Sequence, residues 1–515
     1  MKRRVYISRY VVILISMFLF SPVGISQNQE TKGADVLQTN LKQHVTFLAS
    51  DNLEGRKIGS TGFAAAMKYS EDLFKRAGLK PLFADQNRDD GYRQPVTIIE
   101  RNYTSPGIMA INHGDRRTEF SADLFKYFNL KNDSLFLKNA ALVYLDYGIY
   151  EPAAGWDELA SLDLKGKIAI VKAGAPMNTG NGSLPDSLLA KNESVDGTFN
   201  RLELLAKMDK GPEGIILITN DKFEPLWPRI RSALSRPIYI PGVKLANRIS
   251  LFPVDLILVK PEIGSALLEL APNSPLIGQN QEGHQEFRLL DQTIITMEVP
   301  HSDTVYHSWN LGGFFPGSDP KLKNDFIVVG AHIDHLGVVN NEIMNGADDN
   351  ASGCAAVYEL ARMFKDVPHN RSLAFIIWTG EECEALGSQQ FMTQLPIPAG
   401  NIKGYVNFDM IGRVAPENAA KGSIYLSADK PWLEEVKLLV TQAGNEKDSL
   451  EVDFTTKGLS DHSVFSANGI FSFGFYSGHH ADNHKPTDDI EKIDFIRMRK
   501  IVTFSNRMIL NLLNR

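Results

Sequence analysis

The stretch that decides the fold is an apolar run that ends in polar side chains: Phe326-Ile327-Val328-Val329-Gly330-Ala331-His332-Ile333-Asp334-His335. Short apolar runs without alternation are typical of strands buried on both faces of a parallel sheet. Histidine and carboxylate side chains follow the run at once, and these are common metal ligands. We therefore expect a buried strand whose carboxyl end carries candidate metal ligands.

The same pattern recurs along the C-terminal half of the chain. Further predicted strands are Leu373 to Trp378, Gly404 to Phe408 and Ile470 to Tyr476. Helical spacing of apolar residues separates them, at Ala351 to Phe364, Trp432 to Ala443 and Phe495 to Leu513. Alternating strands and helices predict an α/β fold, with a mixed, mostly parallel central sheet flanked by helices on both faces.

Each predicted strand is followed by chemically active side chains. Glu381 and Glu382 follow the second strand, Asp409 the third, and His484 the fourth after a short loop. A fifth segment between the first strand and its helix adds Asp348 within Asn345-Gly346-Ala347-Asp348-Asp349-Asn350-Ala351-Ser352-Gly353. Ligands in open α/β sheets bind outside the carboxyl ends of the strands, so these groups should meet in one crevice.

Taken one at a time, these residues have ordinary explanations. An acidic pair is usually a solvated loop, and Asp-Asp-Asn before a helix is common capping chemistry. Together, two histidines and three carboxylates form the nitrogen and oxygen ligand set that zinc accepts, and one carboxylate can bridge two ions ~3.5 to 4 Å apart. The combination predicts a two-metal centre.

Size and composition set the wider frame. A chain of 515 residues exceeds what one hydrophobic core usually organises, so we expect two domains rather than one. Hydrophobic residues make up 43% and charged residues 22%, as in an ordinary globular enzyme. The net charge of -7 is spread along the chain, which argues against a nucleic-acid partner.

The N-terminus has the pattern of a secretory signal peptide over residues 1–26. Lys2, Arg3 and Arg4 precede an apolar stretch, and small residues before Gln27 suit cleavage. We expect export to the periplasm or the extracellular space, with no membrane association after cleavage. An uncleaved anchor is the alternative, although the apolar run is shorter than the ~20 residues of a spanning helix.

The remaining residues divide into three predicted parts: 27–114, 115–283 and 284–515. The first contains a helix from Thr61 to Ala77, which Gly78 ends. The second consists of short β runs punctuated by Gly and Pro and lacks clustered histidines and acidic pairs. We expect it to shape or cover a substrate entrance. The two cysteines, Cys354 and Cys383, are too few for a disulfide framework, and we expect buried, non-redox roles for them.

With these motifs in view, the sequence resembles the dizinc aminopeptidase family, which also includes a plasma glutamate carboxypeptidase, folate hydrolases and glutaminyl cyclases. The likeness covers nearly the whole chain after residue 26. It rests on segments 329–335, 346–353, 380–382, 407–413, 460–462 and 484–488, with Glu54-Gly55-Arg56 similar to the start of such domains. The resemblance implies a zinc-exopeptidase-like fold.

The resemblance also implies roles for individual residues. Asp348 would bridge two Zn²⁺ ions, with His332 and Asp409 completing one site and Glu382 and His484 the other. Glu381 would be the general base and acid, and Asp334 the carboxylate that accepts the His332 ring N–H. A cis peptide bond would follow Asp348. The remaining histidines His335, His462 and His479 are expected to be structural, and a contact between His480 and the substrate is left open.

The family resemblance bears on the middle segment and on specificity. Leu164-Lys165-Gly166-Lys167-Ile168 is similar to the inserted protease-associated domain of many members, although any small β domain is the alternative. Glu384 stands where the family more often has Gly, and Asn483 where Tyr commonly precedes the last histidine. Both departures bear on substrate preference.

The expected activity is aminopeptidase cleavage of peptide substrates. The alternatives are a carboxypeptidase or dipeptidase, which would need an Arg clamp for the free carboxylate. A glutaminyl cyclase with one zinc ion and an inactive binding homologue are further alternatives. The oligomeric state is open.

Overall fold

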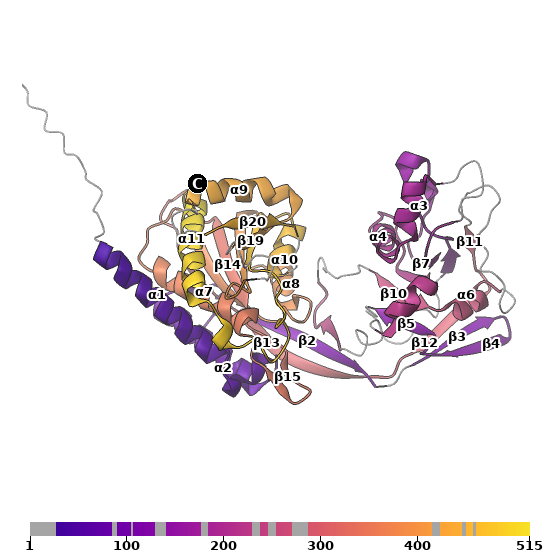
Figure 1. The fold of residues 1–515 in the computed structure, drawn as a ribbon, viewed down its shortest axis with the longest axis horizontal. Coiled ribbons are helices and arrows are strands. Elements are labelled where there is room, and N and C mark those ends of the chain that lie inside the picture. Colours follow the sequence, from indigo (N-terminus) through magenta and orange to yellow (C-terminus); the bar gives the residue numbers. More distant parts are fainter. Residues whose placement is uncertain are drawn as a thin grey trace, which may run out of the picture.

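The computed structural model describes residues 27–84, 90–104, 107–128, 141–176, 184–228, 237–245, 254–269, 287–414, 423–444, 450–456 and 460–515. The signal peptide predicted over residues 1–26 lies outside this range. Within it, no helix combines the length and the apolar character needed to cross a membrane. Figure 1 shows two bodies joined by a pair of long strands.

The larger body is built on a ten-stranded mixed sheet in the order β20-β19-β21-β18-β14-β17-β13-β2-β9, with β1 also paired to β13. Its strands are β1 (Lys80–Pro81), β2 (Arg93–Tyr103), β9 (Ile238–Pro241), β13 (His301–Phe315), β14 (Phe326–His332), β17 (Ser372–Trp378), β18 (Ile402–Asp409), β19 (Ile424–Ser427), β20 (Val452–Thr455) and β21 (Ser472–Tyr476). Strands β17, β14, β18 and β21 are parallel neighbours. The mixed α/β sheet is confirmed, with the parallel pairing confined to this centre and to β19–β20.

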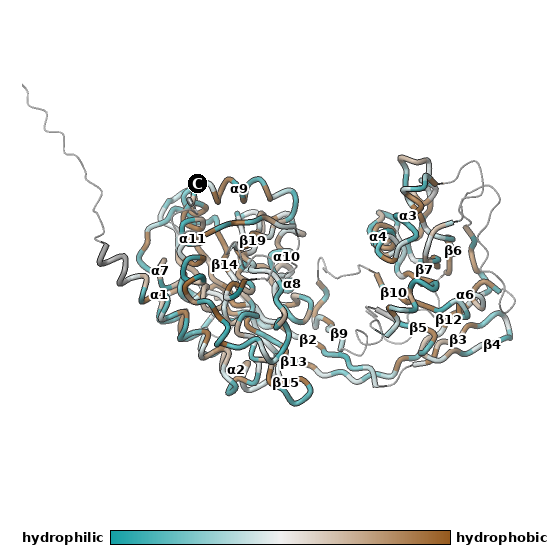
Figure 2. The backbone as a smooth tube through the Cα atoms, in the orientation of Figure 1, coloured by the Kyte–Doolittle hydropathy of each residue, from teal (hydrophilic) through white to brown (hydrophobic). Residues whose placement is uncertain are grey.

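Helices cover both faces of this sheet because its central strands are apolar on both sides. On one face Val329 and Phe375 pack in a core with α1 (Gln27–Leu48), α2 (Thr61–Ala77), α7 (Gly353–Phe364), α9 (Leu433–Ala443) and α11 (Phe495–Asn514). On the other face Trp378 packs with Phe391 of α8 (Leu386–Thr393) and Phe465 of α10 (Asp461–Ala467). In Figure 2 the tube of α1 alternates between hydrophobic and hydrophilic colours, as a helix with one buried face should.

The smaller body lies between β2 and β13 in the chain. Its six-stranded sheet has the order β11-β6-β7-β8-β10-β5, from β5 (Phe125–Phe128), β6 (Ala141–Tyr144), β7 (Lys167–Lys172), β8 (Gly214–Ile218), β10 (Asp255–Val259) and β11 (Arg288–Leu289). A three-stranded sheet adds β3 (Ile108–His113), β4 (Arg116–Ser121) and β12 (Thr293–Glu298). Helices α3 (Asp186–Glu193), α4 (Val195–Ala206) and α6 (Pro261–Leu267) complete it, so this body is less purely β than the sequence predicts.

Two features of the smaller body bear on the predicted bounds of 115–283. Strands β3 and β12, which belong to this body and pair with each other, lie wholly outside those bounds. Strand β9 does not join the smaller sheet; it pairs with β2, so this segment returns to the larger body. The assignment of the insert to the protease-associated type stays a prediction.

Candidate metal centre

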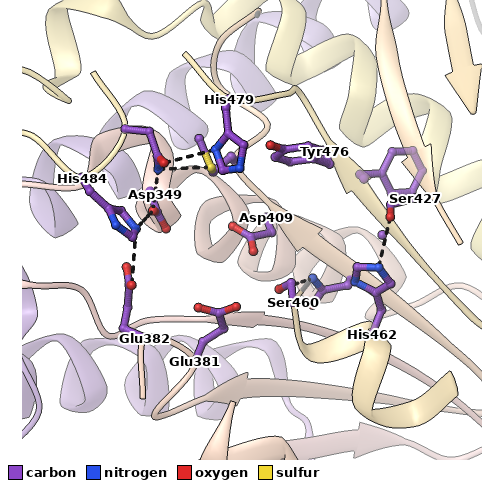
Figure 3. Close-up of a pocket in the computed structure, with 15 residues that line it drawn as sticks. Asp349, Glu381, Glu382, Asp409, Ser427, Ser460, His462, Tyr476, His479 and His484 are labelled. Atoms are coloured by element: carbon purple, nitrogen blue, oxygen red, sulfur yellow. Dashed lines mark hydrogen bonds and ion pairs between the residues drawn. The ribbon is translucent and has the colours of Figure 1, made fainter. Parts of the chain in front are cut away.

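The carboxyl ends of the central strands bring the candidate ligands to one edge of the sheet. His332 ends β14, Asp409 ends β18, and Glu381 and Glu382 lie just after β17. His484 follows β21 in a loop. Figure 3 shows the side chains of Glu381, Glu382, Asp409, Asp349 and His484 around a common space.

The first ligand group is centred on His332. Its Nε2 lies 3.4 Å from Asp409 Oδ1, 3.5 Å from Asp349 Oδ1 and 4.0 Å from Glu381 Oε2. Ligand atoms ~2.0 to 2.2 Å from a tetrahedral zinc ion lie roughly 3.3 to 3.5 Å from one another. The distances from His332 to Asp409 and to Asp349 fall in this range, and the ligand atoms of His332, Glu381 and Asp409 all lie within 4.8 Å of one another.

The second group is centred on Glu382. His484 Nε2 lies 3.4 Å from Glu382 Oε2 and 3.1 Å from Asp349 Oδ2. His335 Nδ1 also approaches this group, 2.7 Å from Glu382 Oε1 and 3.9 Å from Asp349 Oδ2. Asp349 thus turns one carboxylate oxygen toward each group, as a bridging ligand does.

This geometry corrects the sequence-based assignment of Asp348 by one residue. Both carboxylate oxygens of Asp348 face away from the ligand groups: Oδ1 accepts the N–H of Gly412 at 2.6 Å, and Oδ2 lies 3.1 Å from His480 Nε2. The cis peptide bond follows Asp349 rather than Asp348. The turn brings the second aspartate, not the first, to the other ligands.

Asp334 also differs from its expected role. Its carboxylate Oδ1 is 4.0 Å from His332 Nδ1, which lies instead 3.1 Å from the Asp334 main-chain oxygen. The two carboxylate oxygens accept the backbone N–H groups of Glu381 and Glu382, each at 3.3 Å. Asp334 therefore orients the acidic pair, and burial raises its own pKa to about 6.

The backbone of the acidic loop is tightly turned. Gly380, Glu384 and Ala385 all have positive φ, at 73°, 63° and 54°. A left-handed conformation favours glycine, which gives a physical reason for the Gly that the related family more often has at the place of Glu384.

Opposing charges control protonation in the cluster. Hydrogen bonds to Asp349 and Glu382 raise the pKa of His484 to about 10. Burial would raise the pKa of Glu382, but hydrogen bonds from His335 and His484 outweigh it and hold that pKa below its usual range. Burial raises the pKa of Glu381 well above its usual value. The negative potential that holds a proton on His484 is also suited to divalent cations.

A cavity of about 170 Å³ opens beside the ligands. Beyond the acidic cluster it is lined by Asn407, Met410, Ser427, Ser460, His462, Gly474, Phe475, Tyr476, His479 and Asn483. Among these described lining residues there is no Lys or Arg. Arg413, three residues after Met410 of this lining, donates to Asp482 at 2.8 Å.

Two residues of the cluster were not expected from sequence. His335 was predicted to be structural, although its place three residues after His332 on the same loop was a usable signal. Asp349 was passed over in favour of its neighbour, and only the conformation of the turn separates the two. Asn483 is placed beside the cluster, where its Nδ2 donates to Asp349 Oδ2 at 3.0 Å. Cys354 and Cys383 are free and buried.

Comparison with solved structures gives an aminopeptidase from Aneurinibacillus sp. strain AM-1, with 19% identity, a TM-score of 0.49, and coverage of 93% of this chain and 94% of that one. Among curated relatives, leupeptin-inactivating enzyme 1 of Streptomyces exfoliatus is 32% identical over 190 residues, or 36% of this chain and 39% of the relative. A probable leucine aminopeptidase 2 of Aspergillus oryzae is 24% identical over 225 residues, or 42% of this chain and 43% of the relative.

The chain thus spans about two fifths of the length of the curated relatives that it matches. Residues 310–506 match the description "Peptidase family M28", and this range contains both ligand groups. The part of the chain that carries the candidate ligands is thus similar to peptidase family M28.

Proposed function

We propose that this protein is an exported zinc peptidase with two metal ions, and that it removes N-terminal residues from peptides. The observation that carries the proposal is the position of the Asp349 carboxylate, whose Oδ1 lies 3.5 Å from His332 and whose Oδ2 lies 3.1 Å from His484. Two clusters that could hold a metal ion adjoin it, namely His332, Glu381 and Asp409, and His335, Asp349 and Glu382. Their spacing fits zinc, and several carboxylates in one cavity without Lys or Arg among the described lining residues need cationic partners. Export rests on the N-terminal sequence pattern alone.

His332, Asp409 and Asp349 would hold one ion, and Glu382, His484 and Asp349 the other. His335 is a further candidate ligand of the second ion. With zinc held by these residues, the site would supply a water molecule of lowered pKa and a Lewis acid for the scissile carbonyl. Glu381, whose Oε2 lies 4.0 Å from His332 Nε2, takes the proton of the attacking water and passes it to the leaving amine. The Asp334 carboxylate keeps Glu381 in place by accepting the backbone N–H of Glu381.

The charge of the cavity favours aminopeptidase over carboxypeptidase action. A carboxypeptidase must hold a free α-carboxylate, and the lining residues that the structure describes include no Arg or Lys for it. Asp482 already binds Arg413. A free α-amine is cationic and suits a cavity rimmed by carboxylates. The name of the Aspergillus oryzae relative agrees with this choice.

The test combines metal analysis with Glu381→Gln and Glu382→Gln. We expect two zinc ions per wild-type chain and cleavage of amino-acyl anilides but not of N-acetylated peptides. Glu381→Gln should keep both ions and lose roughly 10² to 10⁴-fold in kcat, because it removes only the proton carrier. Glu382→Gln should weaken zinc binding.

Two results would contradict the proposal. Cleavage confined to N-blocked peptides would make the protein a carboxypeptidase. Loss of metal in Glu381→Gln, with full metal in Glu382→Gln, would show that the roles of the two glutamates are exchanged.

A further inference from the structure

Two charged residues outside the ligand groups bind the backbone of the turn that carries Asp349. One binds its carbonyl groups and the other its N–H groups. One is Arg56, from the Glu54-Gly55-Arg56 segment between α1 and α2. The other is Asp488, from the segment that follows His484. Both side chains are fully buried, at 0% exposure.

Arg56 binds the carbonyl side of this turn. Its Nη1 donates to the main-chain oxygen of Asn345 at 2.7 Å, and its Nη2 to that of Gly346 at 3.0 Å. Its Nε donates to the oxygen of Ile333 at 3.0 Å, on the loop between His332 and Asp334. The planar guanidinium thus spans the two backbone segments that carry Asp349 and His332.

Asp488 binds the N–H side of the same turn. Its carboxylate accepts the backbone N–H groups of Asp348 and Asp349 at 3.1 Å, and its main-chain oxygen accepts that of Ala347 at 3.1 Å. Only four positions separate Asp488 from His484. The contact therefore ties the His484 loop to the turn that carries Asp349.

The two contacts match the polarity of the peptide groups that they bind. Carbonyl oxygens carry negative partial charge and face the cation, whereas the N–H groups carry positive partial charge and face the anion. Hydrogen bonds to charged groups are roughly twice as strong as neutral ones. The backbone around this turn is also closely packed. A Cβ at Gly55 would lie 2.3 Å from the main-chain oxygen of Met344, and a Cβ at Gly346 would lie 2.1 Å from the main-chain oxygen of Asp349.

We propose that Arg56 and Asp488 are positioning residues that together hold the Asp349 carboxylate at the point where both metal ions can share it. This inference rests on the proposed function, because it assumes that Asp349 binds metal. Neither residue belongs to the two ligand groups, and the hydrogen bonds described above are to backbone groups. Each acts through the backbone of residues 345–349, and Arg56 acts also through the His332 loop.

A conservative substitution separates this role from ordinary packing. Lysine keeps the charge of Arg56 but cannot donate several hydrogen bonds in a fixed planar fork. The chain offers a matched control in Arg201, which is also buried and donates to main-chain oxygens of Tyr147, Asn192, Lys172 and Gly174 in the smaller body. Arg201→Lys should therefore cost comparable stability without affecting the ligands.

The experiment measures Zn²⁺ affinity by competition with a chromophoric chelator, and the visible absorption of the Co²⁺-loaded proteins. We expect Arg56→Lys to weaken Zn²⁺ binding about 10 to 100-fold and to change the Co²⁺ spectrum, as for other residues that orient metal ligands. Arg201→Lys should bind Zn²⁺ as the wild type does. Asp488→Asn, which keeps the volume and one acceptor, should weaken Zn²⁺ binding in the same direction as Arg56→Lys.

If Arg56→Lys does not fold, Asp488→Asn decides the matter alone. Wild-type Zn²⁺ affinity and an unchanged Co²⁺ spectrum in the folded variants would overturn the inference while leaving the proposed function intact. Equal loss of Zn²⁺ affinity in Arg201→Lys would also overturn it, because the effect would then be one of general stability. A wild-type protein that binds no Zn²⁺ would instead overturn the proposed function.

Discussion

Asp348 and Asp349 are neighbours in the chain, yet their carboxylates have different surroundings. Asp348 is enclosed by donors from its own turn and from the following loop: Gly412 N–H, Ser352 Oγ at 3.2 Å and His480. Asp349 faces His332 and His484. A carboxylate with saturated hydrogen bonding supports the turn, whereas one that faces two ligand groups is available to metal.

Paired substitutions test this division. Asp349→Asn should weaken zinc binding at both sites, because a neutral amide no longer balances the charge of the ions. Asp348→Asn should keep both ions and lose about 1 to 3 kcal/mol of stability, the usual cost of disturbing a buried hydrogen-bonded group. Zinc content and thermal melting of the two variants measure the difference. Loss of zinc in Asp348→Asn alone would restore the sequence-based assignment.

His462 is a second residue whose burial has a measurable consequence. It is 5% exposed, its Nε2 lies 3.3 Å from Ser427 Oγ, and its Nδ1 has no hydrogen-bond partner within the described residues. Burial lowers its pKa to about 4 from an ordinary value of 6.5. The folded protein therefore keeps this imidazole neutral under conditions in which the unfolded chain would protonate it.

The sign of the pH effect follows from this difference. Above pH 6.5 both states are neutral and His462 contributes no pH dependence. As the pH falls from 6.5 to 4, the imidazole binds a proton in the unfolded state but not in the folded state, so the free energy of unfolding falls. The gap between pKa values of 6.5 and about 4 corresponds to roughly 3 kcal/mol at 1.36 kcal/mol per pKa unit.

We expect His462→Gln to lose less stability than the wild type between pH 7 and pH 4, by up to this amount. Urea unfolding of both proteins in the presence of a chelator removes the contribution of bound metal. His479→Gln, at an exposed position lining the same cavity, is the control and should follow the wild type. Parallel pH curves for His462→Gln and the wild type would contradict the prediction.

At the scale of elements, local patterns predicted the sheet and its helices well. The apolar runs at β14 and β17 and the helix from Thr61 to Ala77 agree with the structure to within about a residue. Both features are encoded locally. Uninterrupted apolar runs predict strands buried on both faces, and Gly78, with φ 82°, ends the helix. Four of the five predicted ligands lie in the two groups for the same reason: they follow strand ends.

The remaining features could not be predicted from local patterns, because they depend on contacts between residues far apart in the chain. The choice between Asp348 and Asp349 depends on a turn that Arg56 and Asp488 hold, and both residues are far from it in sequence. Strand β9 was predicted as part of the insert, but its partner is β2 of the larger body. No local pattern encodes either contact.

Helix α1 offers a test of packing at this scale. Leu37, Leu41, Val45 and Leu48 form its buried face, in a core shared with α7 and α11. Leu41→Ala should lower the free energy of unfolding by about 2 to 5 kcal/mol, because it leaves a cavity among packed helices. The exposed neighbour Lys42 is the control, and Lys42→Ala should change stability by less than about 0.5 kcal/mol. Equal effects in urea unfolding would mean that α1 is not part of the cooperative core.

At the scale of the whole molecule, the two bodies meet through a ribbon. Strands β2 and β13 pair antiparallel from Arg93 with Leu311 to Tyr103 with His301, and the smaller body lies at the far end of this ribbon (Figure 1). Strand β9 is the other connection, through its pairing with β2. Within the described residues, the buried core of the larger body receives only partly buried side chains from the insert, Tyr239 and Leu245.

This arrangement predicts that the larger body folds without the insert. Tyr103 and His301 are direct cross-strand partners, so a two-residue Asn-Gly turn between them suits the ribbon and replaces residues 104–300. The shortened chain should melt cooperatively and bind two zinc ions, because both ligand groups and their supports at Arg56 and Asp488 lie outside the deleted segment. Its melting temperature should be lower, since Tyr239 and β9 no longer cover β2.

If the insert shapes the substrate entrance, cleavage of long peptides relative to amino-acyl anilides should change while zinc content does not. A shortened chain that fails to melt cooperatively, with zinc present, would show that β9 is an integral strand of the larger sheet rather than a contact added to its edge.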